Sequence, residues 1–203
     1  MKKYSIWLFV AGVVIFPVTV FAVVKWFEIT YTALPVLGGE AHRIGSFSLV
    51  DQHSHTTSLN DWSDKIVVAD FFFTHCPVVC PKMTRSLKNV QGLYAGDKEL
   101  LLTSFTVDPE RDSVDQLKQY AEKMNIRDNW LLLTGSKKEI YMLARNSFLI
   151  TATDGDGGPQ DFIHSELLVL IDKQKRIRGY YNGTLPSEVD NLLRDISRLK
   201  KEK

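Results

Sequence analysis

Two cysteines, Cys76 and Cys80, are the residues whose type and spacing most directly suggest chemistry. They enclose only three residues, so a disulfide between them would remove little entropy from the unfolded chain and would stabilise a fold weakly. On a helix, residues four apart differ by only about 40°, so both sulfurs can face one point. A helix N-terminus favours the thiolate, which is the form that binds metals or attacks disulfides. The spacing therefore predicts a metal or redox site, and paired thiolates select Cu(I) or Zn(II).

The elements that must position these cysteines alternate between strand and helix. An apolar run at residues 66–73 predicts a buried central strand, and apolar residues at helical spacing follow over 79–93. Cys76 and Cys80 thus fall at the carboxyl end of a strand and in the first turn of a helix, where open α/β sheets place ligand sites. The pattern further predicts a short hairpin at 47–50 and 56–59, strands at 99–107, 131–134, 166–172 and 175–181, and helices at 114–124, 136–148 and 186–199. This order predicts an α/β, thioredoxin-like fold with an added N-terminal hairpin.

The N-terminal segment, residues 4–24, carries no charge and is long enough for one transmembrane helix. Lys2 and Lys3 precede it and Lys25 follows, so the positive-inside bias favours a cytoplasmic N-terminus and an exported domain. The alternative is a cleaved signal peptide, but this apolar run is longer than is usual for one and the site around Ala22 is a poor cleavage site. We expect an anchor at residues 1–29, a linker at 30–45 and a folded domain at 46–203.

The charge balance of the chain and the composition of its first residues limit the classes of partner and the cellular location that we expect. Lys and Arg number 25 against 24 Asp and Glu, with no long basic block, so we expect no nucleic acid partner. No Arg-rich transit segment precedes the apolar run, which favours a bacterial rather than a mitochondrial origin. We therefore expect a single-pass protein of the bacterial inner membrane, with its globular domain in the periplasm or otherwise outside the cytoplasm.

Three separated segments carry a family resemblance. Residues 73–81, with the sequence Phe-Thr-His-Cys-Pro-Val-Val-Cys-Pro, resemble the Sco/SenC family of membrane-anchored copper proteins, which help to assemble the copper centre of cytochrome c oxidase. Residues 107–112 resemble the acidic loop of that family, and residues 162–165 resemble its distal histidine segment. The similarity runs from about residue 46 to residue 183 with the motifs in the same order.

The resemblance implies ligands, cargo and partners. It identifies Cys76, Cys80 and His164 as ligands of a copper ion that arrives as Cu(I), with binding of Cu(II) left open. Asp108 either forms hydrogen bonds near the site, contacts a partner, or caps the loop before Pro109. The implied function is a metallochaperone that delivers copper to the cytochrome c oxidase subunit carrying the copper centre. Other copper or thiol carriers are further partners, and the N-terminal helix would bind the membrane.

The alternative function is a membrane-anchored thiol-disulfide oxidoreductase that keeps partner cysteines reduced, with Cys76 and Cys80 as its redox pair. Two features disfavour it as the main activity. Thioredoxin sites have two residues between the cysteines instead of three, and they place a proline where this chain has residues 163–165. We therefore expect a binding protein rather than an enzyme, and leave thiol-disulfide reductase activity open.

Overall fold

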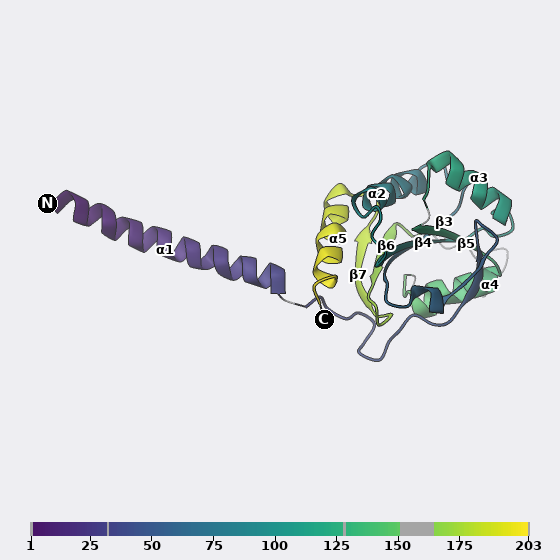
Figure 1. The fold of residues 1–203 in the computed structure, drawn as a ribbon, viewed down its shortest axis with the longest axis horizontal. Coiled ribbons are helices and arrows are strands. Elements are labelled where there is room, and N and C mark those ends of the chain that lie inside the picture. The colour runs from purple at the N-terminus through teal and green to yellow at the C-terminus, as the bar shows by residue number, and fades with distance from the viewer. Residues whose placement is uncertain (1, 32, 128, 151–164, 203) are drawn as a thin grey trace.

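The computed structural model describes residues 2–31, 33–127, 129–150 and 165–202. Figure 1 shows one long helix, α1 (Lys2–Tyr31), which projects from an α/β body. Within these described residues, no helix combines the length and the apolar character needed to cross a membrane. The helical state of the uncharged N-terminal segment agrees with the sequence, whereas its insertion into a membrane stays a prediction.

A seven-stranded sheet in the order β2-β1-β5-β4-β3-β6-β7 forms the centre of the body. Its middle strands β3 (Ile66–Phe72), β4 (Leu100–Thr106) and β5 (Trp130–Thr134) run parallel to one another. The other strands join antiparallel: β6 (Leu167–Ile171) and β7 (Ile177–Asn182) beside β3, and the hairpin of β1 (Ser48–Asp51) and β2 (Thr56–Ser58) beside β5. All residues of β3 and β4 are buried, because both faces of the sheet are covered. The predicted α/β fold with its added hairpin is confirmed.

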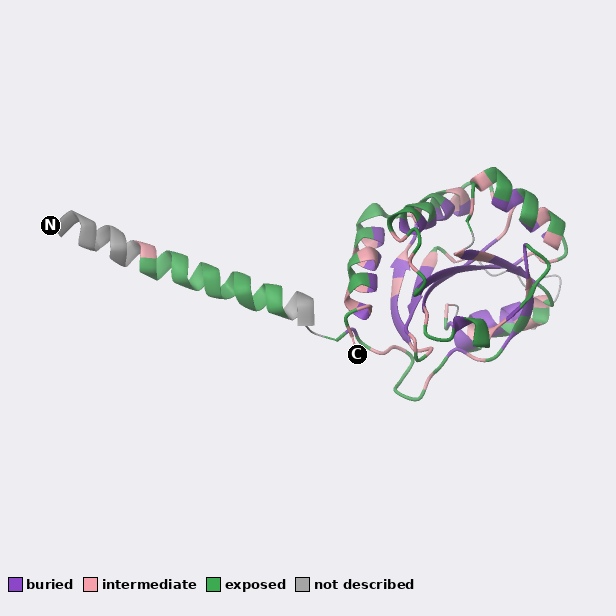
Figure 2. Cartoon of the chain, viewed as in Figure 1, coloured by how far each residue is buried: buried purple, intermediate pink, exposed green. Residues whose placement is uncertain are grey.

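Helices cover the two faces unequally (Figure 1). On one face lie α2 (Val79–Leu93), α3 (Val114–Met124) and α5 (Pro186–Leu199), whose apolar stripes form one core cluster with the sheet. The other face carries α4 (Lys137–Met142) and the short 3₁₀ helix η1 (Leu59–Trp62) over a second cluster. In Figure 2 the buried (purple) parts of these helices lie on the sides of the ribbons that face the sheet. The helix-period pattern of the sequence therefore marks the faces that pack.

The predicted helix at 136–148 is interrupted. Regular α-helix ends at Met142, and Leu143–Ser147 form a π-helical turn, η2, in which the Phe148 amide donates to the Leu143 carbonyl at 2.9 Å. The extra residue in this turn carries the Phe148 ring into edge contacts with Phe71 and Phe105, at centroid distances of 5.1 and 5.3 Å. Aromatic packing therefore decides how the helix ends here.

The segment before the hairpin lies against the body. Leu34 and Ile44 are buried, and the Leu37 amide donates to the Ile177 carbonyl at 2.9 Å. The buried Arg178 side chain donates to the carbonyl oxygens of residues 34 and 35, at 2.5 and 3.1 Å. Residues 34–44 are thus fastened to β7 by apolar burial and by one guanidinium group.

Candidate metal and thiol site

The two cysteines lie beyond the carboxyl end of β3, as the sequence predicts. Cys76 sits in the turn between β3 and α2, and its amide donates to the Phe73 carbonyl at 3.3 Å. Cys80 is the second residue of α2 and is only 5% exposed, whereas Cys76 is half-buried. The Cys80 amide donates to the Cys76 sulfur at 3.3 Å, so the first turn of the helix brings the two residues together. Both cysteines are free thiols.

Their surroundings give the two thiols different acidities. Burial alone disfavours the Cys76 thiolate, but hydrogen bonds from the backbone of residues 78–80 and from the Cys80 thiol outweigh it, and the pKa of Cys76 lies below its ordinary value. Burial raises the pKa of Cys80 to about 12, and the nearby Cys76 and Asp70 add to this rise. Cys76 is therefore the thiol that ionises first, in a half-open position.

Asp70 is a buried carboxyl group on β3 whose charge acts on Cys80. Burial raises the pKa of Asp70 to about 7, although a hydrogen bond from the Ser104 hydroxyl works in the opposite direction. The Trp130 indole in turn donates to the Ser104 oxygen at 2.8 Å. No signal in the sequence analysis singled out this carboxyl group, because one Asp in an apolar run looks only like an interruption.

A cavity of about 270 Å³ opens beside the sulfurs. Its walls are mostly apolar, and both cysteines contribute to them; the lining residues are Phe71, Phe73, Cys76, Val79, Cys80, Val107, Ser165 and Glu166. Ser165 and Glu166 lead into β6, so a segment about 85 residues beyond Cys80 meets the cysteines here. The site is therefore a partly enclosed pocket with two thiols on one wall.

The third predicted ligand, His164, lies outside the described residues, so its position relative to the sulfurs stays a prediction. Among the residues that the structure describes, no group of three or more Cys, His, Asp or Glu side chains is arranged to hold a metal ion. His75, next to Cys76, directs Nδ1 to the Thr74 hydroxyl at 3.0 Å. The described part of the site thus contains two of the three predicted ligands, Cys76 and Cys80.

Asp108 shapes the loop after β4 mainly through its backbone. Its carbonyl accepts from the amides of Arg111 and Asp112, at 3.0 and 2.9 Å, and its own amide donates to the Thr106 hydroxyl at 3.1 Å. Its carboxylate lies 3.8 Å from the Arg111 guanidinium group. These contacts describe a loop-forming residue, and a role at the metal site or towards a partner stays a prediction.

Asp112 is the residue of this region that the sequence analysis did not assign. It is completely buried and accepts hydrogen bonds from Thr74 and from Thr106. A signal was available, because the two adjacent parallel strands both run out into threonines at the same edge of the sheet. Hydroxyl groups that are shielded from water need hydrogen-bond acceptors, and one carboxylate can serve both of these.

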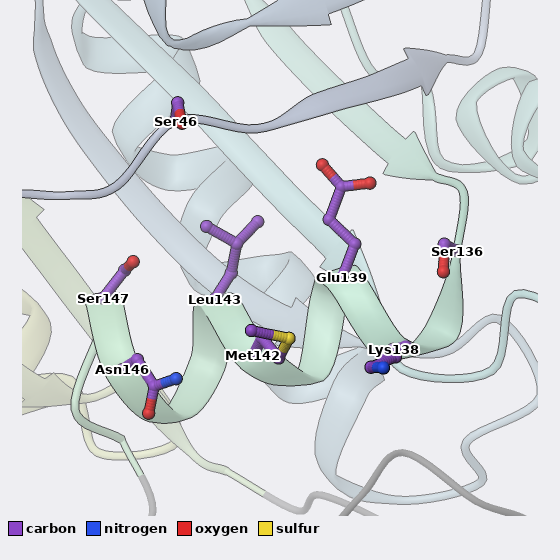
Figure 3. Close-up of a pocket in the computed structure, with 8 residues that line it drawn as sticks. All are labelled: Ser46, Ser136, Lys138, Glu139, Met142, Leu143, Asn146 and Ser147. Carbon is purple, nitrogen blue, oxygen red and sulfur yellow. The ribbon is translucent and has the colours of Figure 1, made fainter.

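A second cavity, of about 330 Å³, lies on the α4 face of the sheet, between Ser46 and the α4–η2 segment (Figure 3). It contains no cysteine or histidine; its lining residues are Ser46, Ser136, Lys138, Glu139, Met142, Leu143, Asn146 and Ser147. Two of its polar groups already hold the chain at and just before the start of β1, because Glu139 accepts from the Ser48 amide and Ser147 accepts from the Gly45 amide. This cavity therefore belongs to the packing of the hairpin.

Comparison with known proteins gives one family. The family model described as SCO1/SenC matches residues 37–201 of this chain. The "SCO1 protein homolog" of Bacillus subtilis is 32% identical over 158 residues, which cover 76% of this chain and 81% of the relative. The region matched by the family model contains the cysteine turn, the acidic loop and the distal histidine segment.

Solved structures agree with the sequence relatives. BsSco, described as a member of the Sco family of cytochrome c oxidase assembly proteins with a disulfide switch, superposes with a TM-score of 0.69 at 29% identity and covers 83% of this chain and 99% of its own. Bradyrhizobium japonicum ScoI, solved with copper bound, superposes with a TM-score of 0.60 at 25% identity, over 76% of this chain and 99% of its own. The α/β, thioredoxin-like fold of the body is thus shared with these proteins.

Proposed function

Because the chain belongs to the SCO1/SenC family, we propose that it is a copper metallochaperone with Cys76, Cys80 and His164 as its ligands. The copper ion is its cargo, and the receiving protein is the cytochrome c oxidase subunit that carries the copper centre. Two similar structures support this proposal, since one was solved with copper bound and the other belongs to a family of oxidase assembly proteins.

The observation that carries the proposal is the pair of free thiols on the wall of one pocket. A hydrogen bond from the Cys80 amide to the Cys76 sulfur holds the pair at the start of α2. Ser165, which follows His164 in the sequence, lines the same pocket. We infer that the imidazole of His164, the residue before Ser165, completes a site with the two soft sulfurs, a ligand set that suits Cu(I).

The geometry supports a releasable ion rather than a permanently bound one. Two thiolates and one imidazole leave Cu(I) short of a closed four-ligand shell, and Cys76 is open to solvent on one side. A cysteine pair of the receiving protein can therefore enter, form Cu–S bonds and displace these ligands one at a time. In this exchange copper stays Cu(I), and each displaced thiolate can take up a proton.

Anaerobic Cu(I) titration of the reduced full-length protein tests the ligand set. We expect one Cu(I) per chain, loss of stable binding in Cys76→Ser and Cys80→Ser, and about 10- to 100-fold weaker retention in His164→Ala. His55→Ala is the matched control, because His55 is exposed on the β1–β2 hairpin. Unchanged copper retention in His164→Ala would remove His164 from the proposed set.

A second candidate function, thiol-disulfide exchange, is favoured by the difference in acidity between the two thiols. In this reaction the Cys76 thiolate attacks a disulfide of the partner and forms a mixed disulfide, with release of one partner thiolate. Cys80 then loses its proton and attacks the Cys76 sulfur, which releases the second partner thiolate. The partner gains two electrons, and Cys76 and Cys80 become a disulfide.

One pair of variants separates the two functions. His164→Ala should impair copper retention while leaving exchange with a small disulfide such as oxidised glutathione within about twofold of wild type. Cys80→Ser should stop exchange at the mixed disulfide, which mass spectrometry detects as one glutathione bound to Cys76. Full exchange activity without Cys80 would eliminate the dithiol mechanism.

For location, we propose that residues 4–24 anchor the protein in the bacterial inner membrane, with the body in the periplasm or otherwise outside the cytoplasm. This uncharged segment supports the proposal, as do the exposed apolar side chains of α1 between Val13 and Phe27. The full-length protein should stay with the membrane pellet after alkaline carbonate extraction. Replacing Val14 and Val18 by Lys should release it to the supernatant.

A further inference from the structure

Asp112, which lies in the loop between β4 and α3, is a buried carboxylate with an unusual set of partners. One of its oxygens accepts from the Thr74 hydroxyl at 2.5 Å. The other accepts from the Thr74 amide at 3.0 Å and from the Thr106 hydroxyl at 2.5 Å. Three donors from two different segments therefore converge on one side chain. A carboxylate can accept all three at once, whereas an amide group has only one oxygen.

These bonds hold the segment from which Cys76 projects. Thr74 stands two residues before Cys76 and is fixed by both its amide and its hydroxyl, and the Gln116 amide group adds a contact to that hydroxyl at 3.4 Å. The Cys76 amide is bonded in turn to the Phe73 carbonyl, one residue before this anchor point. Asp112 thus fixes Thr74 by hydrogen bonds, and Cys76, two residues further on, is fixed by the bond from its own amide.

The same carboxylate ties this turn to the neighbouring strand. Thr106 is the last residue of β4, and its hydroxyl both donates to Asp112 and accepts from the Asp108 amide. The Val107 amide donates to the Phe72 carbonyl at 2.8 Å, so the ends of β3 and β4 are joined just below the site. Asp112 therefore connects the loop after β4 with the turn that carries Cys76.

We propose that Asp112 is a positioning residue for the Cys76–Cys80 pair, acting through Thr74. It keeps the turn in the conformation in which the Cys80 amide reaches the Cys76 sulfur, so that both thiols are presented to the same ion or the same partner sulfur. This inference rests on the proposed function of the pair. Removing a group that hydrogen-bonds to a metal ligand and orients it typically lowers metal affinity about 10- to 100-fold.

The test uses reduced full-length protein and two readouts. The first is the rate at which bound Cu(I) passes to a competing chelator, bathocuproine disulfonate. The second is the equilibrium between the dithiol and oxidised glutathione, which yields the Cys76–Cys80 disulfide and two molecules of reduced glutathione. In Asp112→Ala we expect copper release about 10- to 100-fold faster, and an equilibrium constant for disulfide formation about 10-fold lower, because two loosely held thiols have a lower effective concentration.

Two variants distinguish positioning from general destabilisation. Asp112→Asn keeps one oxygen that can accept from the Thr74 amide, so both readouts should recover part of the way to wild type. Asp172→Asn removes a charge from another buried carboxyl group, at the opposite edge of the sheet, and should leave both readouts within about twofold of wild type. If Asp112→Ala fails to fold, Thr74→Val replaces it, with an expected shift of at least about threefold in each readout.

The outcomes separate this inference from the proposed function. Wild-type protein that retains no Cu(I) would refute the copper function, while the glutathione equilibrium still decides the role of Asp112. If Asp112→Ala and Asp112→Asn match wild type within twofold in both readouts, Asp112 does not position the pair. An equal shift in Asp172→Asn would also overturn the proposal, because loss of stability alone would then explain the effect.

Discussion

Asp112 and Asp172 are both buried aspartates, but they stand at opposite edges of the sheet and are satisfied in different ways. Asp172 accepts from the guanidinium groups of Arg176 and Arg178 at 2.7 and 3.0 Å, besides two backbone amides. The partners of Asp112 are one amide and two hydroxyl groups, with the His75 ring 3.8 Å away. One edge is therefore held by ion pairs, and the edge with the thiols is held by neutral donors.

The difference between charged and neutral hydrogen-bond donors matches the role of each edge of the sheet. Arg178 binds Asp172, the segment after α1 and the C-terminal Glu202 together, so cations at that edge fasten three parts of the chain. A fixed cation at the other edge would repel the Cu(I) ion that we propose the cysteines bind. There, backbone amide groups stabilise the Cys76 thiolate, and they add no net positive charge. Neutral donors thus fix the turn that carries Cys76 without adding a positive charge beside the cysteines.

Breaking the ion-paired edge should have the largest effect. Arg178→Met leaves the Asp172 carboxylate and two backbone carbonyls without their buried partner, so we expect the free energy of unfolding to fall by about 3–5 kcal/mol. Urea unfolding of the full-length protein in mild detergent measures this loss. Arg176→Met is the matched control: its side chain is 26% exposed and binds the same oxygen, so it should cost about 1 kcal/mol or less. Equal losses of unfolding free energy in the two variants would contradict the conclusion that the buried Arg178 holds this edge.

A third buried carboxyl group, Asp70, sharpens the comparison, because its hydrogen-bond donor is one hydroxyl group. With its pKa raised to about 7, Asp70 keeps its proton in the folded protein over a range where the unfolded chain has lost it. Unfolding releases that proton, so this contribution to stability is present below about pH 4 and is lost as the pH rises to about 7. The rise in the pKa of Asp70 from 3.8 to about 7 corresponds to about 4 kcal/mol at most.

Asp70→Asn should remove this pH dependence, since the amide stays neutral throughout. We expect the difference in free energy of unfolding between variant and wild type to shift in favour of the variant by about 2–4 kcal/mol from pH 4 to pH 8. Denaturant titrations at several pH values measure it. Asp115→Asn, which alters an exposed carboxylate of α3, is the control for the loss of one carboxyl group. A flat profile for Asp70→Asn would show that Asp70 is ionised in the folded protein at neutral pH.

Most of the fold could be read from the sequence where local periodicity and burial agree. The apolar run that became β3 and the helical spacing that became α2 placed Cys76 and Cys80 correctly, because strand, turn and helix are adjacent in the chain. The interrupted helix at 136–148 could not be predicted in this way. Its π-helical turn depends on aromatic contacts between Phe148 and strands far away in the sequence.

The candidate site also contains one part that local sequence predicts and another that depends on contacts between distant segments. Two candidate ligands on one helical turn follow from spacing alone, whereas the Asp112 cluster needs donors from the turn after β3 and from the end of β4 to meet a loop from a third place in the chain. The threonine at the end of each strand was visible, but their common acceptor was not. His164 came only from family resemblance, and its approach to the sulfurs stays a prediction. The cysteine pair could be predicted from local spacing, whereas the contacts of Asp112 depend on how distant segments of the chain pack together.

The smallest expected effect tests whether the neutral donors at the thiol edge contribute at all. Thr106→Val keeps the shape of the side chain but removes the hydroxyl that Asp112 and the Asp108 amide both use, so it should lower the free energy of unfolding by about 1–2 kcal/mol. Thr103 offers a matched control on the same strand. It is equally buried, and its hydroxyl has no hydrogen-bond partner among the described residues.

Thr103→Val should therefore be neutral or slightly stabilising, because it replaces an unsatisfied polar group by a methyl group of similar size. Urea unfolding of both variants at one pH gives the difference directly, without any assumption about the metal. Equal values for the two threonines would mean that the bonds to Asp112 add nothing to stability. The neutral edge would then be held by packing alone, and its contrast with the ion-paired edge would lose its energetic basis.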